Sequence, residues 1–296
     1  MPVFPSSSAS APSSPSLPPV PPSGAPWRSA ATAAVVARLR AAGCVFAEDE
    51  ARLLISAAPT PDRLTALVDR RAGGLPLEHV LGWAEFCGLR VTVDRGVFVP
   101  RPRTAFLVHR AAACGPPAGP GRPAPVVVDL CCGSGAVGAA LAEALGRVEL
   151  HAVDIDPAAV RCARRNLAPA GGRVHEGDLY EPLPARLRGR VDILVANAPY
   201  VPTGAITLLP PEARDHEPLT ALDGGADGLE IQRRVAAGAL RWLAPGGHLL
   251  IETGGHQAPD TAGVFAAAGL IPRVGHSEEL DATVVTGTRP HRGPVP

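Results

Sequence analysis

From about residue 126 to residue 253, short apolar runs alternate with segments of helical periodicity. Helices are expected from about Ser134 to Leu145, from Pro157, from about Asp227 to Leu243 and from about Gln257. The apolar runs between them are VVVDL (126–130), VELHAVD (148–154), GRVHEGD (172–178), VDILVAN (191–197) and GGHLLIET (246–253), and a β pair closes the chain. Strands separated by helices form a mainly parallel sheet with helices on both faces. The sequence therefore predicts an α/β fold in which ligands bind at the carboxyl ends of the strands.

The chain before this region has a different character. Residues 1–26 are mostly Pro, Ser and Ala without a charge, so we expect a disordered tail. Residues 27–84 contain three helical segments, the third with Thr60 as N-cap and Pro61 at the first helical position, which predicts a small helical domain. Residues 85–103 alternate around a turn at 94–96, which predicts a β-hairpin that links this domain to a second one at 104–290. Residues 114–125, CGPPAGPGRPAP, are expected to form a loop.

Charge and cysteine content argue against several functions. The 28 basic and 28 acidic residues balance, so the chain lacks the overall positive charge that attracts nucleic acid or an anionic membrane. The six cysteines form no C-x-x-C pair and no histidine lies at zinc-ligand spacing, so neither a metal site nor a disulfide framework is indicated. No apolar run approaches the roughly 20 residues of a membrane helix, and the N-terminus does not resemble a signal peptide. We expect a cytoplasmic protein.

A glycine-rich turn follows the first predicted strand, in VVVDLCCGSGAVG (126–138). Gly133, Gly135 and Gly138 match G-x-G-x-x-G, a pattern in which the backbone approaches a ligand closely and a helix N-terminus faces it. Asp129 at the end of this strand would repel a pyrophosphate, but its carboxylate can pair with an ammonium group such as that of a bound methionine moiety. The turn therefore favours a cofactor that carries an amino acid.

The next two strands also end in acidic residues. Asp154 ends the second strand, where a carboxylate can accept both hydroxyls of a ribose. Asp178 follows the third strand, where a carboxylate can accept from an adenine amino group while Leu179 covers the ring. A single such acid is typical of a surface turn, but three acids at the ends of three successive strands indicate a ligand site.

The segment N-A-P-Y, residues 197–200, follows the fourth strand at the same edge of the sheet. A planar amine or amide nitrogen is a poor nucleophile, so an enzyme that uses it must orient both of its N–H groups. The Asn197 side chain and the Ala198 main chain each offer a carbonyl, and Tyr200 can stack on a flat acceptor. The segment therefore predicts a grip for a planar –NH2 group.

Taken together, these motifs resemble the HemK/PrmC family of protein-(glutamine-N5) methyltransferases, within the class I S-adenosylmethionine-dependent methyltransferases. The resemblance covers about residues 70–257. It rests on RRAGGLPLEHVLGWAEFCGLRVTVDRGVFVPRPRT, the glycine-rich turn, AVDID, GDLYEPL, NAPY, and HEPLTALDGGADGLEIQRR with LAPGGHLLIETGGHQ. It implies a Rossmann-like methyltransferase domain preceded by a helical domain that recognises the substrate.

The resemblance also assigns the site. It implies that S-adenosylmethionine is the cofactor, that no metal takes part, and that the substrate is a protein such as a peptide chain release factor or a ribosomal protein. Asn197 and Tyr200 would be catalytic, and the acceptor glutamine would be held by Asn197, Ala198, Pro199 and Tyr200. The residues that would bind the cofactor are Asp129, Cys131, Cys132, Gly133, Ser134, Gly135, Asp154, Asp178, Leu179 and Asn197.

Three departures from the family pattern affect this assignment. Ala198 replaces the first proline of N-P-P-Y, and Cys131 replaces the first glycine of the cofactor turn, where its side chain can crowd the ligand. Arg103 and Ala105 stand on either side of Thr104, where the family usually has acids. The reversed charge at Arg103 leaves open an acceptor other than the family's usual one, the glutamine of the release-factor G-G-Q loop.

Three other functions share part of this pattern. Methylation of an exocyclic base amine in DNA or RNA uses related (N/D)-P-P-(Y/F/W) motifs, although zero net charge argues against it. A non-catalytic S-adenosylmethionine-binding or ribosome-associated protein would tolerate the changes at Cys131 and Arg103, but it would not need Asn197 and Tyr200. A nicotinamide-dependent oxidoreductase would leave N-A-P-Y without a task.

Overall fold

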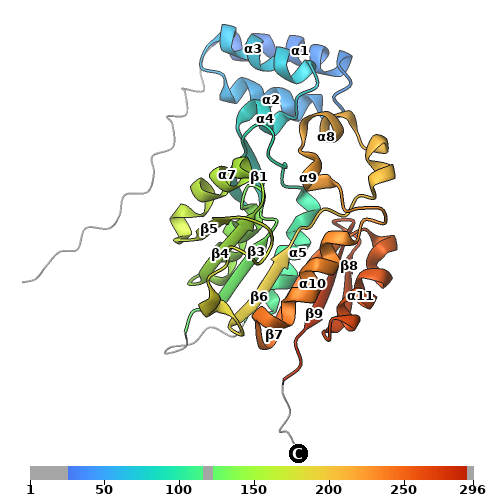
Figure 1. Cartoon of the computed structure of the whole chain (residues 1–296). Helices are drawn as coiled ribbons and strands as arrows, with labels where there is room; N and C mark the ends of the chain where they lie inside the picture. The colour runs from blue at the N-terminus through green and yellow to red at the C-terminus, as the bar shows by residue number, and fades with distance from the viewer. Residues whose placement is uncertain (1–25, 116–122, 292–296) are drawn as a thin grey trace, which may run out of the picture. The chain divides into compact units, whose positions relative to one another are not determined.

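The computed structural model describes residues 26–115 and 123–291 (Figure 1). Residues 1–25 of the predicted tail and 116–122 of the predicted loop lie outside the described residues. The chain separates into two compact units, one that ends at Ala72 and one that begins at Gly73. The domain limits expected from the sequence stay predictions.

The first unit consists of the three expected helices. They are α1 (Pro26–Ala41), α2 (Ala47–Ala57) and α3 (Pro61–Ala72). The Thr60 hydroxyl accepts a hydrogen bond from the Arg63 amide at 3.2 Å, which confirms the predicted N-cap. Leucines of all three helices, including Leu39, Leu54 and Leu64, are buried and form the core of this unit.

The second unit opens with α4 (Leu77–Leu81) and a hairpin of β1 (Trp83–Phe86) and β2 (Leu89–Thr92). The predicted hairpin is present, but its turn is Cys87–Gly88 and the predicted position at 94–96 is wrong. Both turn residues have positive φ, 49° and 76°, as a two-residue hairpin turn requires. A turn does close at Asp94–Val97, but it follows the end of β2. The sequence DRG marks a turn more strongly than CG does, which explains the misplacement.

A seven-stranded sheet forms the centre of the second unit. Its strands are β3 (Val126–Leu130), β4 (Glu149–Asp154), β5 (Arg173–Glu176), β6 (Val191–Ala196), β7 (Leu243–Thr253), β8 (Ile271–Ser277) and β9 (Ala282–Thr288). The spatial order is β5-β4-β3-β6-β7-β9-β8, and β9 alone runs in the direction opposite to the other six strands. The predicted mainly parallel α/β fold is therefore confirmed.

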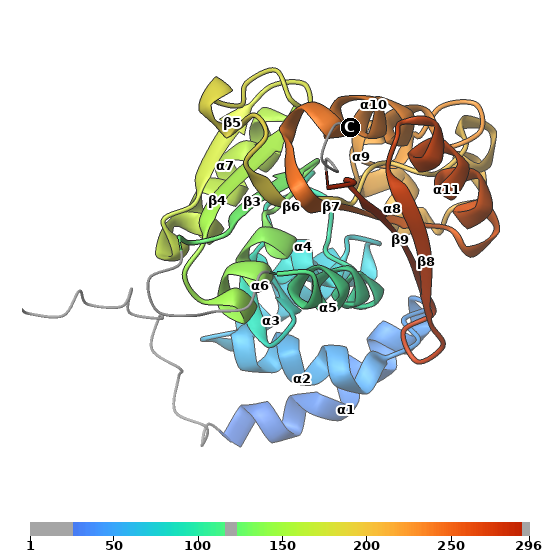
Figure 2. The same ribbon diagram turned by 90° about the horizontal axis from the view of Figure 1, so that it is seen from below.

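Helices cover both faces of this sheet (Figure 2). The helices on one face are α5 (Ala105–Ala113), α6 (Ala136–Leu145) and α7 (Pro157–Leu167), and those on the other are α10 (Glu230–Trp242) and α11 (Ala258–Ala267). Shorter elements complete the unit: η1 (Pro102–Thr104), η2 (Ala168–Ala170), η3 (Ala185–Leu187), η4 (Thr203–Leu208), α8 (Pro211–His216), α9 (Leu219–Leu222) and η5 (Gly255–Gln257). Each face buries its own apolar cluster, so the sheet is the middle of three layers.

The strand order reverses at β3, which lies between β4 and β6. In open α/β sheets this reversal creates a crevice outside the carboxyl ends of the strands, where ligands bind. Asp129 pairs with Val195 across the two strands, so the turn after β3 and the segment after β6 emerge side by side. No helix in the described ranges is long and apolar enough to cross a membrane.

Candidate active site

The turn after β3 is built around Asp129, whose side chain is 1% exposed. Its carboxylate accepts a hydrogen bond from the Gly138 amide of α6 at 2.9 Å. A Cβ at position 138 would lie 3.2 Å from the same oxygen, so glycine permits this close approach. Burial raises the pKa of Asp129 to about 7, and the nearby charge of Asp154 adds to the rise. A cation that reached this carboxylate would stabilise its ionised form.

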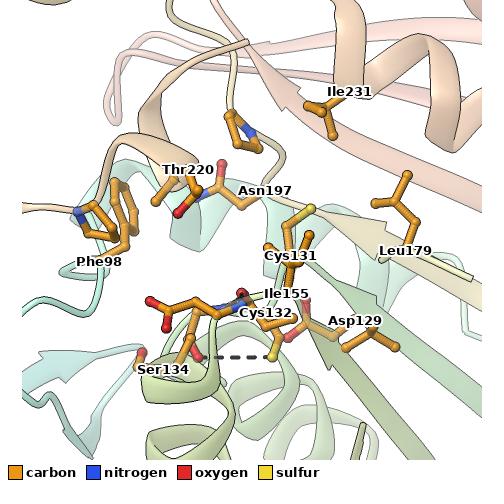
Figure 3. Close-up of a pocket in the computed structure, with 18 of the residues that line it drawn as sticks. Phe98, Asp129, Cys131, Cys132, Ser134, Ile155, Leu179, Asn197, Thr220 and Ile231 are labelled. Atoms are coloured by element: carbon orange, nitrogen blue, oxygen red, sulfur yellow. Dashed lines mark hydrogen bonds between the residues drawn. The ribbon is translucent and has the colours of Figure 1, made fainter. Parts of the chain in front are cut away.

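Cys131 follows in a left-handed backbone conformation, with φ of 54°. A residue with a Cβ adopts this region at an energetic cost, and glycine does not. Cys131 therefore occupies a backbone conformation that favours the glycine it replaces, and its side chain can crowd a ligand there. Figure 3 shows the Cys131 side chain between Asn197 and Leu179. Burial raises the pKa of its thiol, and three nearby carboxylates raise it further, so the thiol stays protonated.

The end of β4 holds the opposite side of the turn. The Cys132 amide donates to the Val153 carbonyl at 3.0 Å, and the Gly133 amide donates to the Asp154 carboxylate at 2.8 Å. The second carboxylate oxygen of Asp154 accepts from the Asp156 amide at 2.9 Å. Each carboxylate oxygen keeps a lone pair for a further donor, so Asp154 can still accept hydroxyl groups.

Asp178, after β5, forms an ion pair that the sequence did not predict. Its carboxylate lies 2.6 Å from the guanidinium of Arg234 on α10. The other oxygen has no partner among the described residues and can accept from a ligand. The next residue, Leu179, is buried with a φ of 48°. The turn at 178–180 is anchored to α10 a second time by the Tyr180 hydroxyl, which donates to the Val235 carbonyl at 2.6 Å.

These strand ends surround a cavity of about 400 Å³, within the usual range for small-molecule sites (Figure 3). Predicted cofactor residues on its wall are Asp129, Cys131, Cys132, Gly133, Ser134, Asp154, Asp178, Leu179 and Asn197. Gly135 does not line it and packs instead against Ala163 and Leu167. Lining residues that the sequence did not predict include Phe98, Ile155, Thr220, Ile231 and Arg234. Ile155, which is 58% exposed, could have been inferred as the apolar neighbour of Asp154.

The N-A-P-Y segment separates this cavity from a second one of about 660 Å³. Pro199 faces the first cavity, Ala198 and Tyr200 face the second, and Asn197 lines both. Neither the Asn197 side chain nor the Ala198 carbonyl forms a hydrogen bond with any residue that the structure describes. Both acceptors are therefore available to a ligand.

Hydrogen bonds on its carboxyl side hold this segment in place. The Val201 amide donates to the Leu222 carbonyl at 3.0 Å. Gln257, which is buried, donates to the Tyr200 carbonyl at 3.0 Å and to the Asp227 carbonyl at 3.2 Å. Segments far apart in the sequence thus fix N-A-P-Y before a ligand arrives.

The second cavity lies between the PRPRT loop and the segment after N-A-P-Y. Apolar side chains make up most of its wall, including Phe98, Pro102, Leu209, Pro210, Leu222 and Leu280. Glu217 ties the two sides together, because its buried carboxylate accepts from the Val99 amide at 3.1 Å and pairs with Arg101 at 2.7 Å. Its role could not be read from the sequence, since no local pattern relates Glu217 to a loop so far away.

The sheet order, the reversed last strand and the cavity at the switch point define the class of protein. This is the fold of the class I methyltransferases. A solved structure of a methyltransferase from Pyrococcus furiosus has this fold, with a TM-score of 0.50 at 15% identity over 69% of this chain and 90% of that one. Residues 120–209 match the family described as the methyltransferase small domain.

Similarity to individual proteins defines the family more narrowly. A release factor glutamine methyltransferase from Geobacter sulfurreducens is 40% identical over 71% of this chain and 72% of its own length. A 4-amino-L-phenylalanine/4-methylamino-L-phenylalanine methyltransferase from Streptomyces pristinaespiralis is 36% identical over 79% of this chain and 80% of its own length. The chain belongs to the release factor glutamine methyltransferase family, as its sequence motifs predicted.

Proposed function

We propose that this protein transfers a methyl group from S-adenosylmethionine to the side-chain amide nitrogen of a glutamine in a protein, with a peptide chain release factor as the acceptor. The similarity to a release factor glutamine methyltransferase from Geobacter sulfurreducens supports this acceptor. The two cavities that meet at Asn197 support a reaction between two ligands.

The residues of the first cavity fit S-adenosylmethionine. The buried Asp129 would pair with the methionine ammonium, Asp154 would accept the ribose hydroxyls, and the free oxygen of Asp178 would accept from the adenine amino group. Ile155 and Leu179 offer apolar contacts for the ring. The bound cofactor supplies an electrophilic methyl group on a positively charged sulfur, so the leaving group is a neutral thioether and no metal is needed.

The residues of the second cavity suit a planar nitrogen acceptor. The Asn197 side-chain carbonyl and the Ala198 main-chain carbonyl would each accept one N–H, which leaves the nitrogen lone pair directed at the first cavity. Pro199 biases Ala198 toward an extended conformation. The Tyr200 ring would stack on the acceptor, while its hydroxyl is held by Arg103 at 2.7 Å. Burial raises the pKa of Tyr200, so its hydroxyl stays protonated and does not serve as a base.

One observation carries the proposal: Asn197, the only amide side chain of N-A-P-Y, lines both cavities and has no protein partner in the described chain. The half-buried Asn197 amide therefore keeps its hydrogen-bonding groups available to ligands in both cavities. A methyl donor in the first cavity and an N–H donor in the second would both lie beside this amide.

The test is transfer of label from S-adenosylmethionine to a purified release factor, with the modified residue identified by mass spectrometry. We expect label on glutamine, and we expect Asn197→Ala to lose at least a hundredfold in turnover. Cofactor affinity should fall by less than tenfold, because a single hydrogen bond contributes about 1 kcal/mol. Gln232→Ala, which removes a buried amide outside both cavities, separates loss of stability from loss of the acceptor grip. Full turnover by Asn197→Ala would contradict the mechanism, and label that only nuclease releases would instead indicate a nucleic-acid acceptor.

A second candidate acceptor is an aromatic amine on a free amino acid. The Streptomyces pristinaespiralis relative is named for such a substrate, and the largely apolar second cavity with Phe98 and Tyr200 suits a planar aromatic ring. Parallel reactions with a release factor and with 4-amino-L-phenylalanine distinguish the two. If 4-amino-L-phenylalanine is methylated and the release factor is not, the acceptor is the free amino acid and the proposed protein acceptor is wrong.

A further inference from the structure

The hydroxyl of Tyr200 is the meeting point of two charged side chains from separate elements. The guanidinium of Arg103, in η1, donates to this hydroxyl at 2.7 Å. The carboxylate of Glu252, near the end of β7, lies 3.5 Å from the same hydroxyl and 3.3 Å from Arg103 Nε. The three side chains therefore form a closed triangle that fixes the outer end of the Tyr200 ring.

Glu252 is the least accessible member of this triangle. It is 2% exposed, and its second carboxylate oxygen is buried without a hydrogen-bond partner among the described residues. Burial raises its pKa, which the Thr104 side chain and then the charge of Arg103 oppose. Arg103 is the one cation within ion-pair distance of this carboxylate in the described parts of the chain. Arg103 is therefore the counter-ion that favours the ionised form of this buried carboxylate.

The geometry requires an arginine. Arg103 uses Nε for Glu252 and Nη2 for Tyr200, so two donors of one rigid fork reach two different acceptors. A lysine carries all its donors on one nitrogen at the end of a flexible chain, so it cannot hold both acceptors at a fixed separation. Arg103 also keeps 46% of its side chain exposed and lines the second cavity, so it is not simply a buried counter-ion.

We propose that Arg103 and Glu252 are positioning residues for the methyl acceptor, which act by fixing the Tyr200 ring beside Asn197. This inference rests on the proposed methyl transfer and deepens it. A tyrosine that is held only at its Cβ can tilt its ring, whereas one held also at its hydroxyl presents a fixed flat face to the acceptor. None of the three residues lines the first cavity, so their effect is confined to the acceptor.

The first test needs no turnover. The chain contains two tyrosines, Tyr180 and Tyr200, so protein labelled with 13C at the phenolic carbon gives two resonances. Tyr200→Phe identifies its signal. Arg103→Gln and Glu252→Gln should each move that signal and leave the Tyr180 signal in place, because the Tyr180 hydroxyl bonds to the Val235 carbonyl elsewhere. An unmoved Tyr200 signal in both variants would overturn the triangle.

The second test measures how the residues depend on one another during turnover. Tyr200→Phe and Arg103→Gln should each lower kcat/KM for the acceptor about fivefold to tenfold, as expected for one hydrogen bond, with cofactor affinity within twofold of wild type. The double variant should be no worse than Tyr200→Phe alone, since both changes remove the same contact. Arg103→Lys should recover less than half of the loss. In a matched double-mutant cycle with Tyr180→Phe and Arg103→Gln, the two effects on kcat/KM should multiply, because these side chains do not contact each other.

The outcomes separate the two proposals. Wild-type protein that methylates neither a release factor nor 4-amino-L-phenylalanine would refute the proposed acceptors and leave the NMR test to decide the triangle. Active wild type with multiplicative effects of Arg103→Gln and Tyr200→Phe would refute the positioning role alone. Equal losses of cofactor affinity and acceptor turnover would show that the variants only disturb the fold.

Discussion

Single residues at the cofactor end combine two features that oppose folding. Asp129 places a carboxyl group where water does not reach, and Cys131 places a Cβ in a left-handed conformation. Such features persist where a site needs them, because the rest of the structure is stable enough to tolerate them. A single substitution at each position relieves the unfavourable feature there. The change in unfolding free energy can then be compared with the change in cofactor affinity at that position.

Asp129→Asn should stabilise the protein at high pH and weaken cofactor binding. The folded pKa of Asp129, about 7, lies above the unfolded value of 3.8, so the folded state binds the extra proton between these pH values. Stability from this group is therefore complete below about pH 4 and is lost as pH rises through 7. The variant lacks this loss, and its advantage should reach about 2 to 4 kcal/mol at pH 8. Urea unfolding at pH 4 and pH 8 measures it, and a constant difference between the two proteins would contradict the buried charge.

Cys131→Gly should relieve backbone strain and open the first cavity. Glycine removes a cost of about 1 to 2 kcal/mol for the left-handed conformation but adds about 0.5 to 1 kcal/mol of unfolded-state entropy. We expect a net gain of up to about 1 kcal/mol and a several-fold tighter cofactor, measured by chemical unfolding and calorimetry. Cys132→Gly is the matched control: this buried neighbour does not have positive φ, so the same change should destabilise. Equal effects at the two positions would rule out strain at Cys131.

Helices and strands position the site through contacts between distant segments, and α7 provides two of them. Asp156 caps this helix by accepting from the Ala158 amide at 2.8 Å, which sets the helix start beside Asp154. Near its end, the Asn166 amide donates to the carbonyls of Thr92 and Ser134, both at 2.8 Å, and accepts from the Thr92 amide at 2.9 Å. One side chain thus fastens strand β2 to the cofactor turn.

Asn166→Ala should loosen both attachments. Several backbone groups would lose their partner, so we expect a loss of about 2 to 3 kcal/mol in unfolding free energy and weaker cofactor binding through Ser134. Asn166→Asp keeps an acceptor for the Thr92 amide but sets a carboxylate against two carbonyls, so it should be at least as harmful. Arg161→Ala, on the exposed side of α7, should change stability by less than about 0.5 kcal/mol. An Asn166→Ala protein as stable as this control would disprove the attachment.

The same elements show how far sequence reasoning reaches. Local signals were sufficient where structure is local: the Asp156–Pro157 helix start, the Thr60 cap and the strands that end in acids. They failed where two residues meet only after folding, as with Arg234 on Asp178 and Glu217 on Arg101. The hairpin turn was misplaced because Cys87 adopts a left-handed conformation that its residue type does not announce. The site was therefore predictable at the strand ends and unpredictable in the side chains that reach them from other elements.

At the scale of the whole molecule, the chain consists of a helical unit and a methyltransferase unit that each have their own core. The helical unit is locked by an ion pair between Glu50 and Arg71, which are 8% and 6% exposed. Arg71 contacts both carboxylate oxygens, at 2.6 and 3.0 Å. Such a pair makes the stability of this unit depend on one residue, since breaking it leaves a buried charge.

Arg71→Ala should therefore unfold the helical unit selectively. Loss of the partner of Glu50 costs about 3 to 5 kcal/mol, a large share of what a unit of this size can have. If this unit recognises the protein acceptor, turnover of a release factor should fall steeply while cofactor affinity, set by strand ends in the other unit, stays within twofold. Hydrogen exchange should accelerate in residues 26–72 and not in 126–253, and Arg63→Ala, an exposed arginine of the same helix, should behave as wild type. A parallel fall in cofactor affinity would mean that the two units fold as one, and undiminished turnover would remove the helical unit from acceptor recognition.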